Sequence, residues 1–172
     1  PTLMIFGTEE QKKKHLPKIA AGETFWCTGY SEPEVGSDMA SMRCRAVRKG
    51  NEYVINGQKV WTSGAHIADR MFGLVRTNPD APKHRGISYL LIDMKSPGIT
   101  VRPLVQMNGE ADFCEVFFDN VRVPRANLVG QENQGWFVAL TTLAFERSAI
   151  GAVVVQARHV LEDIIQFAKE TK

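Results

Sequence analysis

Hydrophobic positions divide the chain into a helical start, a long middle of short strands and a helical end. In the first segment Thr8 and Gln11 form a capping box, which predicts a helix that runs to about Ala20. Pro17 predicts a break or kink within this helix. Three of its residues are expected to face a core: His15, Leu16 and Ile19.

From Phe25 to about Val123 the pattern changes to short strands separated by turn residues, which is typical of an antiparallel sheet or barrel. Gly50-Asn51 separates the expected strands 43–49 and 52–55. Asn56-Gly57, a strong signal for a type I′ hairpin, separates the expected strands 52–55 and 58–62. The expected strands begin at Phe25 and continue as 43–49, 52–55, 58–62, 71–77, 87–93, 99–104 and 114–123.

From about Gly135 apolar residues recur every three or four positions and predict one helix of about 35 residues. Its apolar stripe is wider than one small β-domain covers, so further helices or another subunit are expected to bury it. The predicted fold class is therefore mainly β with flanking α. It is an antiparallel β-barrel or two-sheet domain with an N-terminal helix and a long C-terminal helix.

Composition narrows the possible partners. The 172 residues are 44% hydrophobic and 23% charged, typical of a globular protein, and the net charge of +2 gives no reason to expect nucleic acid. No apolar run approaches the length that spans a bilayer, so no membrane span is expected. The three cysteines and four histidines show no metal-ligand spacing, which predicts no metal site and a reducing, cytosol-like compartment.

The segment 28–38, TGYSEPEVGSD, is polar and rich in turn residues. Pro33 fixes its own φ and pushes Glu32 toward an extended conformation, and Gly36 permits a close approach. We expect a rigid loop that presents hydroxyls and backbone N–H groups on one side, which suits a flat ligand with polar edges. An ordinary surface loop has the same pattern.

This loop resembles the signature of the acyl-CoA dehydrogenase family. The resemblance continues through NGQKVWTSGA at 56–65 and FFDNVRVP at 117–124, in the family's order and spacing. It implies the end of an N-terminal helical domain at 1–24, the middle β-domain at 25–128 and the first helix of a C-terminal helical domain at 129–172. Because the chain starts at Pro1 and stops within a helical pattern, we expect a piece of a longer protein, inactive alone.

The resemblance implies an FAD site. In similar proteins the tryptophan at the position of Trp61 packs against the flavin ring, and groups at the positions of Thr62 and Ser63 bond the flavin's N5 and O4 edge. Many relatives have Ile and Thr at these two positions, so the needed hydroxyl is kept. From the residues alone, a tryptophan at a strand end also serves as core or interface filling.

Further binding residues are implied in the loop. Tyr30 and Ser31 match positions that bond the flavin's pyrimidine side, and Ser37 matches a residue that contacts both the cofactor and the pantetheine of acyl-CoA. Backbone donors here would favour negative charge on the reduced ring. Glu32 and Asp38 are interpreted as structural: one bonds neighbouring backbone and the other caps a turn.

The implied reaction is α,β-dehydrogenation of an acyl-CoA thioester, in which a carboxylate takes the α-proton and the β-hydrogen leaves as hydride to the flavin. Glu146 falls where a subset of the family carries this base. In most relatives the glutamate lies far downstream, beyond Lys172 in this numbering. Glu146 could instead only pair with a neighbour such as Arg147, which matches a residue near the CoA portion of the substrate.

The resemblance also implies a homotetramer that passes electrons to an electron-transfer flavoprotein, in a bacterial cytoplasm or a mitochondrial matrix. Two alternatives stay open: a flavin oxidase or monooxygenase on the same scaffold, and a non-catalytic structural β-domain. Cys114 stands where close relatives often have Asn. Without a partner histidine it is expected to be a small buried residue and not a nucleophile.

Overall fold

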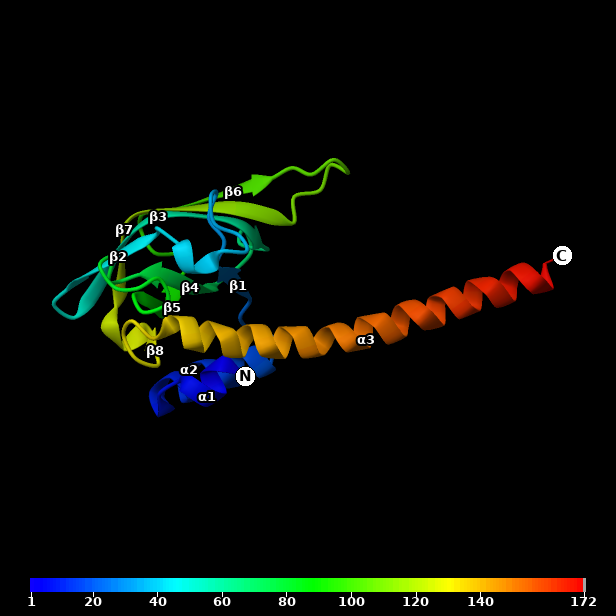
Figure 1. The fold of residues 1–172 in the computed structure, drawn as a ribbon, viewed down its shortest axis with the longest axis horizontal. Coiled ribbons are helices and arrows are strands. Elements are labelled where there is room, and N and C mark those ends of the chain that lie inside the picture. The colour runs from blue at the N-terminus through cyan, green and yellow to red at the C-terminus, as the bar shows by residue number, and fades with distance from the viewer. Residues whose placement is uncertain (172) are drawn as a thin grey trace.

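The computed structural model describes residues 1–171 and contains a mixed eight-stranded sheet with helices packed on one face (Figure 1). The helices are α1 (Thr2–Phe6), α2 (Glu9–Ala20) and α3 (Gly135–Glu170), with 3-10 turns η1 (Met39–Ser41) and η2 (Arg125–Asn127). The strands are β1 (Trp26–Gly29), β2 (Arg45–Lys49), β3 (Glu52–Ser63), β4 (Arg70–Arg76), β5 (Ile87–Asp93), β6 (Ile99–Leu104), β7 (Phe113–Pro124) and β8 (Leu128–Val129).

The strand order is β6-β7-β3-β2-β4-β5-β8, and β1 pairs with β4 beside this path. The prediction of a mainly β fold with flanking helices is confirmed. The prediction of purely antiparallel pairing is wrong, because β4 pairs in parallel with both β1 and β2. The long connection that carries β2 and β3 separates β1 from β4 and makes parallel pairing possible. A closed barrel is not confirmed, since β6 and β8 stand at opposite ends of the order.

The hairpin predicted at Asn56-Gly57 is wrong, because β3 runs through these residues as one strand. The pairing of β3 with β7 shifts register between Ile55 and Gly57, which marks a β-bulge. Gly57 has φ 143°, and a Cβ there would lie 2.8 Å from the Cα of Cys44. Glycine is therefore needed where β3 closely approaches the segment that leads into β2. Asn56 accepts a hydrogen bond at 2.9 Å from the backbone of Asn120 on β7.

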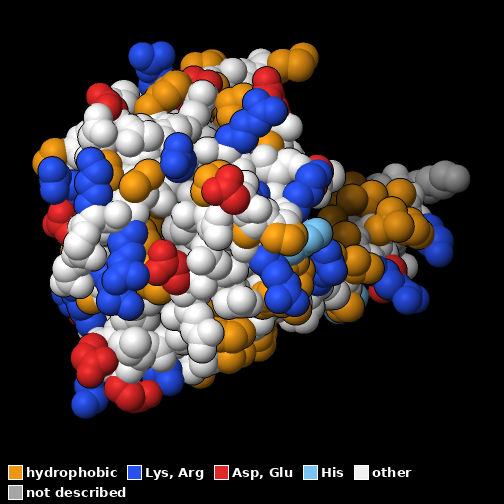
Figure 2. Space-filling view, turned by 60° about the vertical axis from the view of Figure 1, so that its left-hand side comes forward, with side chains coloured by type: hydrophobic (Ala, Val, Ile, Leu, Met, Phe, Trp, Pro, Cys, Tyr) orange, Lys and Arg blue, Asp and Glu red, His pale blue; other side chains and the backbone are white. Residues whose placement is uncertain are grey.

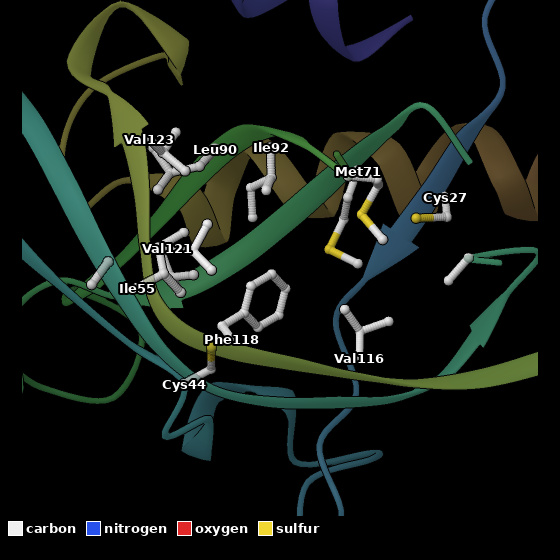
Figure 3. Close-up of a cluster of buried hydrophobic side chains, with 14 of the residues drawn as sticks. Cys27, Cys44, Ile55, Met71, Leu90, Ile92, Val116, Phe118, Val121 and Val123 are labelled. Carbon is white, nitrogen blue, oxygen red and sulfur yellow. The ribbon is translucent and has the colours of Figure 1, made fainter. Parts of the chain in front are cut away.

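Strands β4 and β5 are buried on both faces, so they form the centre of the molecule. Successive strand residues point to opposite faces. Met71, Leu90 and Ile92 meet Val116 and Phe118 of β7 in one core cluster (Figure 3). The alternate residues face the helices in a second cluster: Phe72, Leu74, Tyr89 and Leu91.

The predicted ends of the chain are confirmed as helices. The capping box of Thr8 and Gln11 is present, but α2 continues through Pro17, so the predicted break is wrong. Pro17 stands in the last turn, where its missing N–H costs a single hydrogen bond. His15 is buried, whereas Ile19 is 38% exposed.

Helix α3 packs its first turns between the sheet and α1 and then extends away from both (Figure 1). Apolar side chains cover its projecting part (Figure 2), among them Phe145, Ile150, Val153, Leu161 and Ile164. By length and mean hydropathy this helix is apolar enough to cross a membrane, so the expectation that no segment approaches that length is wrong. A core helix of a soluble protein meets the same criteria, and the exposed stripe fits the predicted need for a cover.

The close approach at Gly57 can be tested by adding one methyl group. We expect Gly57→Ala to lower the free energy of unfolding by about 3 kcal/mol, because both the backbone conformation and the contact with Cys44 are disturbed. Gly50→Ala is the control: Gly50 also has a positive φ, of 60°, but nothing lies within 4 Å of an added Cβ. That variant should lose only about 1 kcal/mol in the same urea titration. Equal losses would contradict the close-approach argument.

Candidate functional site

A cavity of about 430 Å³ lies between β1, the end of β3 and the face of α3. Its volume falls within the range of small-molecule and cofactor sites. It brings together most of the predicted site residues: Tyr30, Ser31, Trp61, Ser63 and Glu146. The remaining wall is formed by Phe25, Trp26, Cys27, Thr28, Val60 and Leu143.

Trp61 has an unusual backbone conformation. Its φ is 58°, and it lies in an irregular stretch where the pairing of β3 with β7 shifts between Lys59 and Thr62. A bulky side chain rarely adopts a positive φ, which costs roughly 1–3 kcal/mol and is typical of functional sites. The side chain is 63% exposed and meets Phe113 edge-on, with ring centroids 6.1 Å apart. The irregularity therefore presents an aromatic ring at the cavity.

The same irregularity decides which hydroxyl reaches the cavity. Ser63 lines it, whereas Thr62 is only 1% exposed, and its Oγ1 has no hydrogen-bond partner among the described residues. Gly64 follows with φ 65°, and its missing Cβ leaves room for the ring of Phe25. Of the two predicted hydroxyls, Ser63 is the one that the cavity offers to a ligand.

A buried ion pair holds the polar loop in place. Lys59 Nζ donates to Glu32 Oε1 at 2.8 Å and to the carbonyl of Tyr30 at 3.0 Å. The carboxylate of Glu32 also accepts from the backbone N–H groups of Arg43 at 2.6 Å and Cys44 at 2.9 Å. Glu32 thus bonds neighbouring backbone as predicted. Lys59 is not among the residues predicted for the site from the sequence, and only the fold shows that it is buried.

The loop also bonds to itself. The N–H groups of Glu32 and Val35 each donate to the other residue's carbonyl at 2.9 Å. Two of the backbone donors predicted for a ligand are therefore used within the loop. The carbonyl of Ser31 accepts from the N–H of Val60 at 3.0 Å, which ties the loop to β3.

A chain of hydroxyls connects this loop to the helices. Tyr30 donates to the hydroxyl of Tyr89 at 3.1 Å, Tyr89 lies 3.4 Å from the hydroxyl of Thr142, and Thr142 is hydrogen-bonded to Thr2 at 2.7 Å. Burial raises the pKa of Tyr30, and the charge of Glu146 adds to the rise, so the phenol stays neutral at neutral pH. The chain joins α1 and the sheet to the turn of α3 that precedes Glu146.

Three loop and helix residues of the prediction lie elsewhere. Ser37 and Arg147 are exposed and do not line the cavity, so their contacts with cofactor and CoA stay predictions. Asp38 accepts from Lys83 Nζ at 2.8 Å and from the hydroxyl of Ser41. Asp38 stands at the N-cap position of η1, as predicted, but its side chain makes no capping bond to the backbone.

The structure gives Cys114 a partner that the sequence analysis missed. His66 Nδ1 lies 3.4 Å from its sulfur. Cys114 is completely buried, so its thiol reaches no ligand in the cavity, and packing is its evident role. Burial raises the pKa of the neighbouring Cys27 to about 12, which leaves that thiol unreactive at neutral pH.

Comparison with known proteins shows the family to which the chain belongs. The sequence model "Acyl-CoA dehydrogenase, middle domain" matches residues 27–121, more than half of the chain. The chain belongs to the acyl-CoA dehydrogenase family. The acyl-CoA dehydrogenase IpdE1 of Mycobacterium tuberculosis is 46% identical over 99% of this chain, which spans 45% of that relative.

Two solved structures support the same conclusion. One is named "Tcur3481-Tcur3483 steroid ACAD" and superimposes with a TM-score of 0.93 at 41% identity, covering 99% of this chain and 44% of the other. The second is the ChsE4-ChsE5 complex from Mycobacterium tuberculosis, with a TM-score of 0.78 at 47% identity over 84% of this chain and 37% of the other. The chain therefore spans less than half the length of the relatives that it matches.

The buried ion pair predicts a large cost for losing one partner. Lys59→Met should lower the free energy of unfolding by about 3–5 kcal/mol, because the carboxylate of Glu32 stays buried without its cation. Arg122→Gln is the control, since it removes an exposed pair with Glu52 and should cost less than about 1 kcal/mol. Urea titration of both variants measures the difference. A loss for Lys59→Met as small as the control's would show that the pair does not hold the loop.

Proposed function

We propose that the whole protein is an FAD-dependent dehydrogenase that introduces an α,β double bond into acyl-CoA thioesters. The observation that carries the proposal is one cavity lined both by the exposed, backbone-strained Trp61 and by the carboxylate of Glu146. These residues come from β3 and α3, which are far apart in the sequence. Family membership supports the reaction class, and the cavity supports the residues.

The residues around the cavity fit a flavin. Trp61 offers an exposed aromatic face, and Ser31 and Ser63 offer hydroxyls at the rim. FAD, when bound, accepts the two electrons that the substrate loses. The protein's part is to hold a flat ring against Trp61 and to bond its polar edges from the loop and from β3.

Glu146 is proposed as the base that takes the α-proton of the substrate. Its carboxylate lies at the cavity, one helical turn beyond the hydroxyl network at Thr142, which fixes this part of α3 against the sheet. Leu143 lines the same cavity one turn before it and offers apolar surface to an acyl group. A base held in this way acts only on a substrate placed between α3 and the loop.

The acceptor and the assembly are part of the proposal. We propose an electron-transfer flavoprotein as the acceptor of the electrons and an oligomer of related chains as the working form. The exposed apolar stripe of α3 supports an additional covering element. The name of each solved structure described above contains two different proteins. An assembly of two related chains is therefore a candidate beside the homotetramer.

The function is tested by anaerobic titration of the whole protein with a panel of acyl-CoAs, while the visible absorption of the flavin is followed. The panel includes straight-chain, branched and steroid-derived thioesters, the last because one similar structure is named a steroid ACAD. Bleaching supports the proposal. A colourless protein that stays colourless with added FAD would favour a structural β-domain, and fast reoxidation by oxygen would favour an oxidase.

Trp61 should control retention of the flavin. Trp61→Ala is expected to reduce the FAD content of the purified whole protein and to weaken FAD binding roughly tenfold or more, because the aromatic contact is lost. Trp61→Phe keeps a ring and should retain most of the cofactor. Absorbance ratios and FAD titration measure both effects. Unchanged FAD content in Trp61→Ala would remove this residue from the site.

Glu146 should control the chemistry and not the binding. Glu146→Gln is expected to slow acyl-CoA-dependent bleaching by about 10²–10⁴-fold while FAD content stays normal. Glu162→Gln is the matched control, since Glu162 is an exposed glutamate on the same helix that pairs with Arg158. Stopped-flow absorbance compares them. If the flavin of Glu146→Gln is bleached at the same rate as that of the wild-type protein, the base lies in a part of the protein outside this chain.

A further inference from the structure

A second cavity, of about 200 Å³, lies between α1, α2 and the helix-facing side of the sheet. Its walls are mainly apolar and include Leu3, Leu16, Ile19 and Phe72. None of these residues lines the cavity with Trp61 and Glu146. Trp26 of β1, however, lines both cavities and is the residue that the two linings have in common.

Trp26 is held firmly in this position. Its ring stacks on Phe72 of β4 with centroids 4.5 Å apart and planes at 25°, and meets the ring of His15 of α2 edge-on at 5.2 Å. The indole N–H donates to the hydroxyl of Thr24 at 3.1 Å. Contacts from a helix, a strand and its own connecting segment therefore fix this side chain between the cavities.

Helix α3 runs past both spaces. Thr142 lines the second cavity, whereas Leu143 and Glu146, within the next turn, line the first. Thr142 and Glu146 are four positions apart on α3, so they share one face of this helix, and that face borders both cavities. The mainly apolar walls of that space match a hydrocarbon tail better than the charged CoA portion.

We propose that Trp26 sets the length of the acyl group that this site accepts, by closing it off from the second apolar cavity. This inference rests on the function proposed above. The occupant excluded from the second cavity is the hydrocarbon tail of a straight-chain acyl-CoA. Removing the indole joins the two spaces and admits a longer tail.

The test uses the whole protein with FAD bound and measures kcat/KM for butyryl-, octanoyl- and palmitoyl-CoA. Trp26→Ala should raise the ratio of palmitoyl- to butyryl-CoA roughly tenfold or more, and Trp26→Leu should raise it less. Ile19→Phe fills the second cavity from a partly exposed position. Alone it should leave the wild-type ratio unchanged, because Trp26 still closes the space. Combined with Trp26→Ala it should abolish the gain.

Three results would overturn the inference. An unchanged ratio in both Trp26 variants with normal FAD content removes Trp26 as the limit on length. A changed ratio in Ile19→Phe alone means that the wild-type acyl group already enters the second cavity. A gain in Trp26→Ala that survives the added Ile19→Phe means that the tail goes elsewhere. If no acyl-CoA bleaches the flavin of the wild-type protein, the proposed function itself fails. If the wild-type flavin is bleached but the variants do not alter the preference for chain length, only the inference about Trp26 fails.

Discussion

The buried pair of Lys59 and Glu32 is the interaction on which the rest of the site depends. Two opposite charges removed from water are stable only when further hydrogen bonds satisfy them, and here one carbonyl and two backbone N–H groups do so. These bonds tie the polar loop to the start of β2 and to the middle of β3. Because Lys59 immediately precedes the segment that carries Trp61, the loop and the aromatic ring are fixed relative to each other.

Trp61 and Glu146, the other two main parts of the site, each need a backbone position that local structure does not favour. Trp61 requires a backbone conformation that a tryptophan adopts only at a cost, and the irregular pairing between β3 and β7 imposes it. Glu146 requires an exposed position on a helix that is nevertheless fixed in orientation. The start of α3 meets this requirement, since Gly135 packs on the backbone of Ser88 without room for a Cβ. The rigid sheet thus positions two residues that no local interaction brings together.

Much of the fold could be predicted from hydrophobic spacing and capping residues. The boundaries of β5 and β6 and the long helix from Gly135 follow from local patterns, which the tertiary structure did not override. Two of the errors share one cause. At Asn56-Gly57 and at Pro17 the residue type suits a turn or a break, but neighbouring strands and an established helix supply the backbone partners that keep the element continuous.

The sequence by itself determined the family, and it singled out Tyr30, Ser31, Trp61 and Glu146, all of which line the cavity, because these residues lie in short motifs with fixed spacing. The tertiary structure alone decided that Ser63 and not Thr62 faces the cavity, that Lys59 neutralises Glu32, and that Trp26 lines two cavities. The first depends on which face of an irregular strand points to the cavity. The other two depend on which distant elements come into contact. The spacing of hydrophobic residues in the sequence specifies neither of these, because a single-residue shift in register exchanges the two faces of a strand.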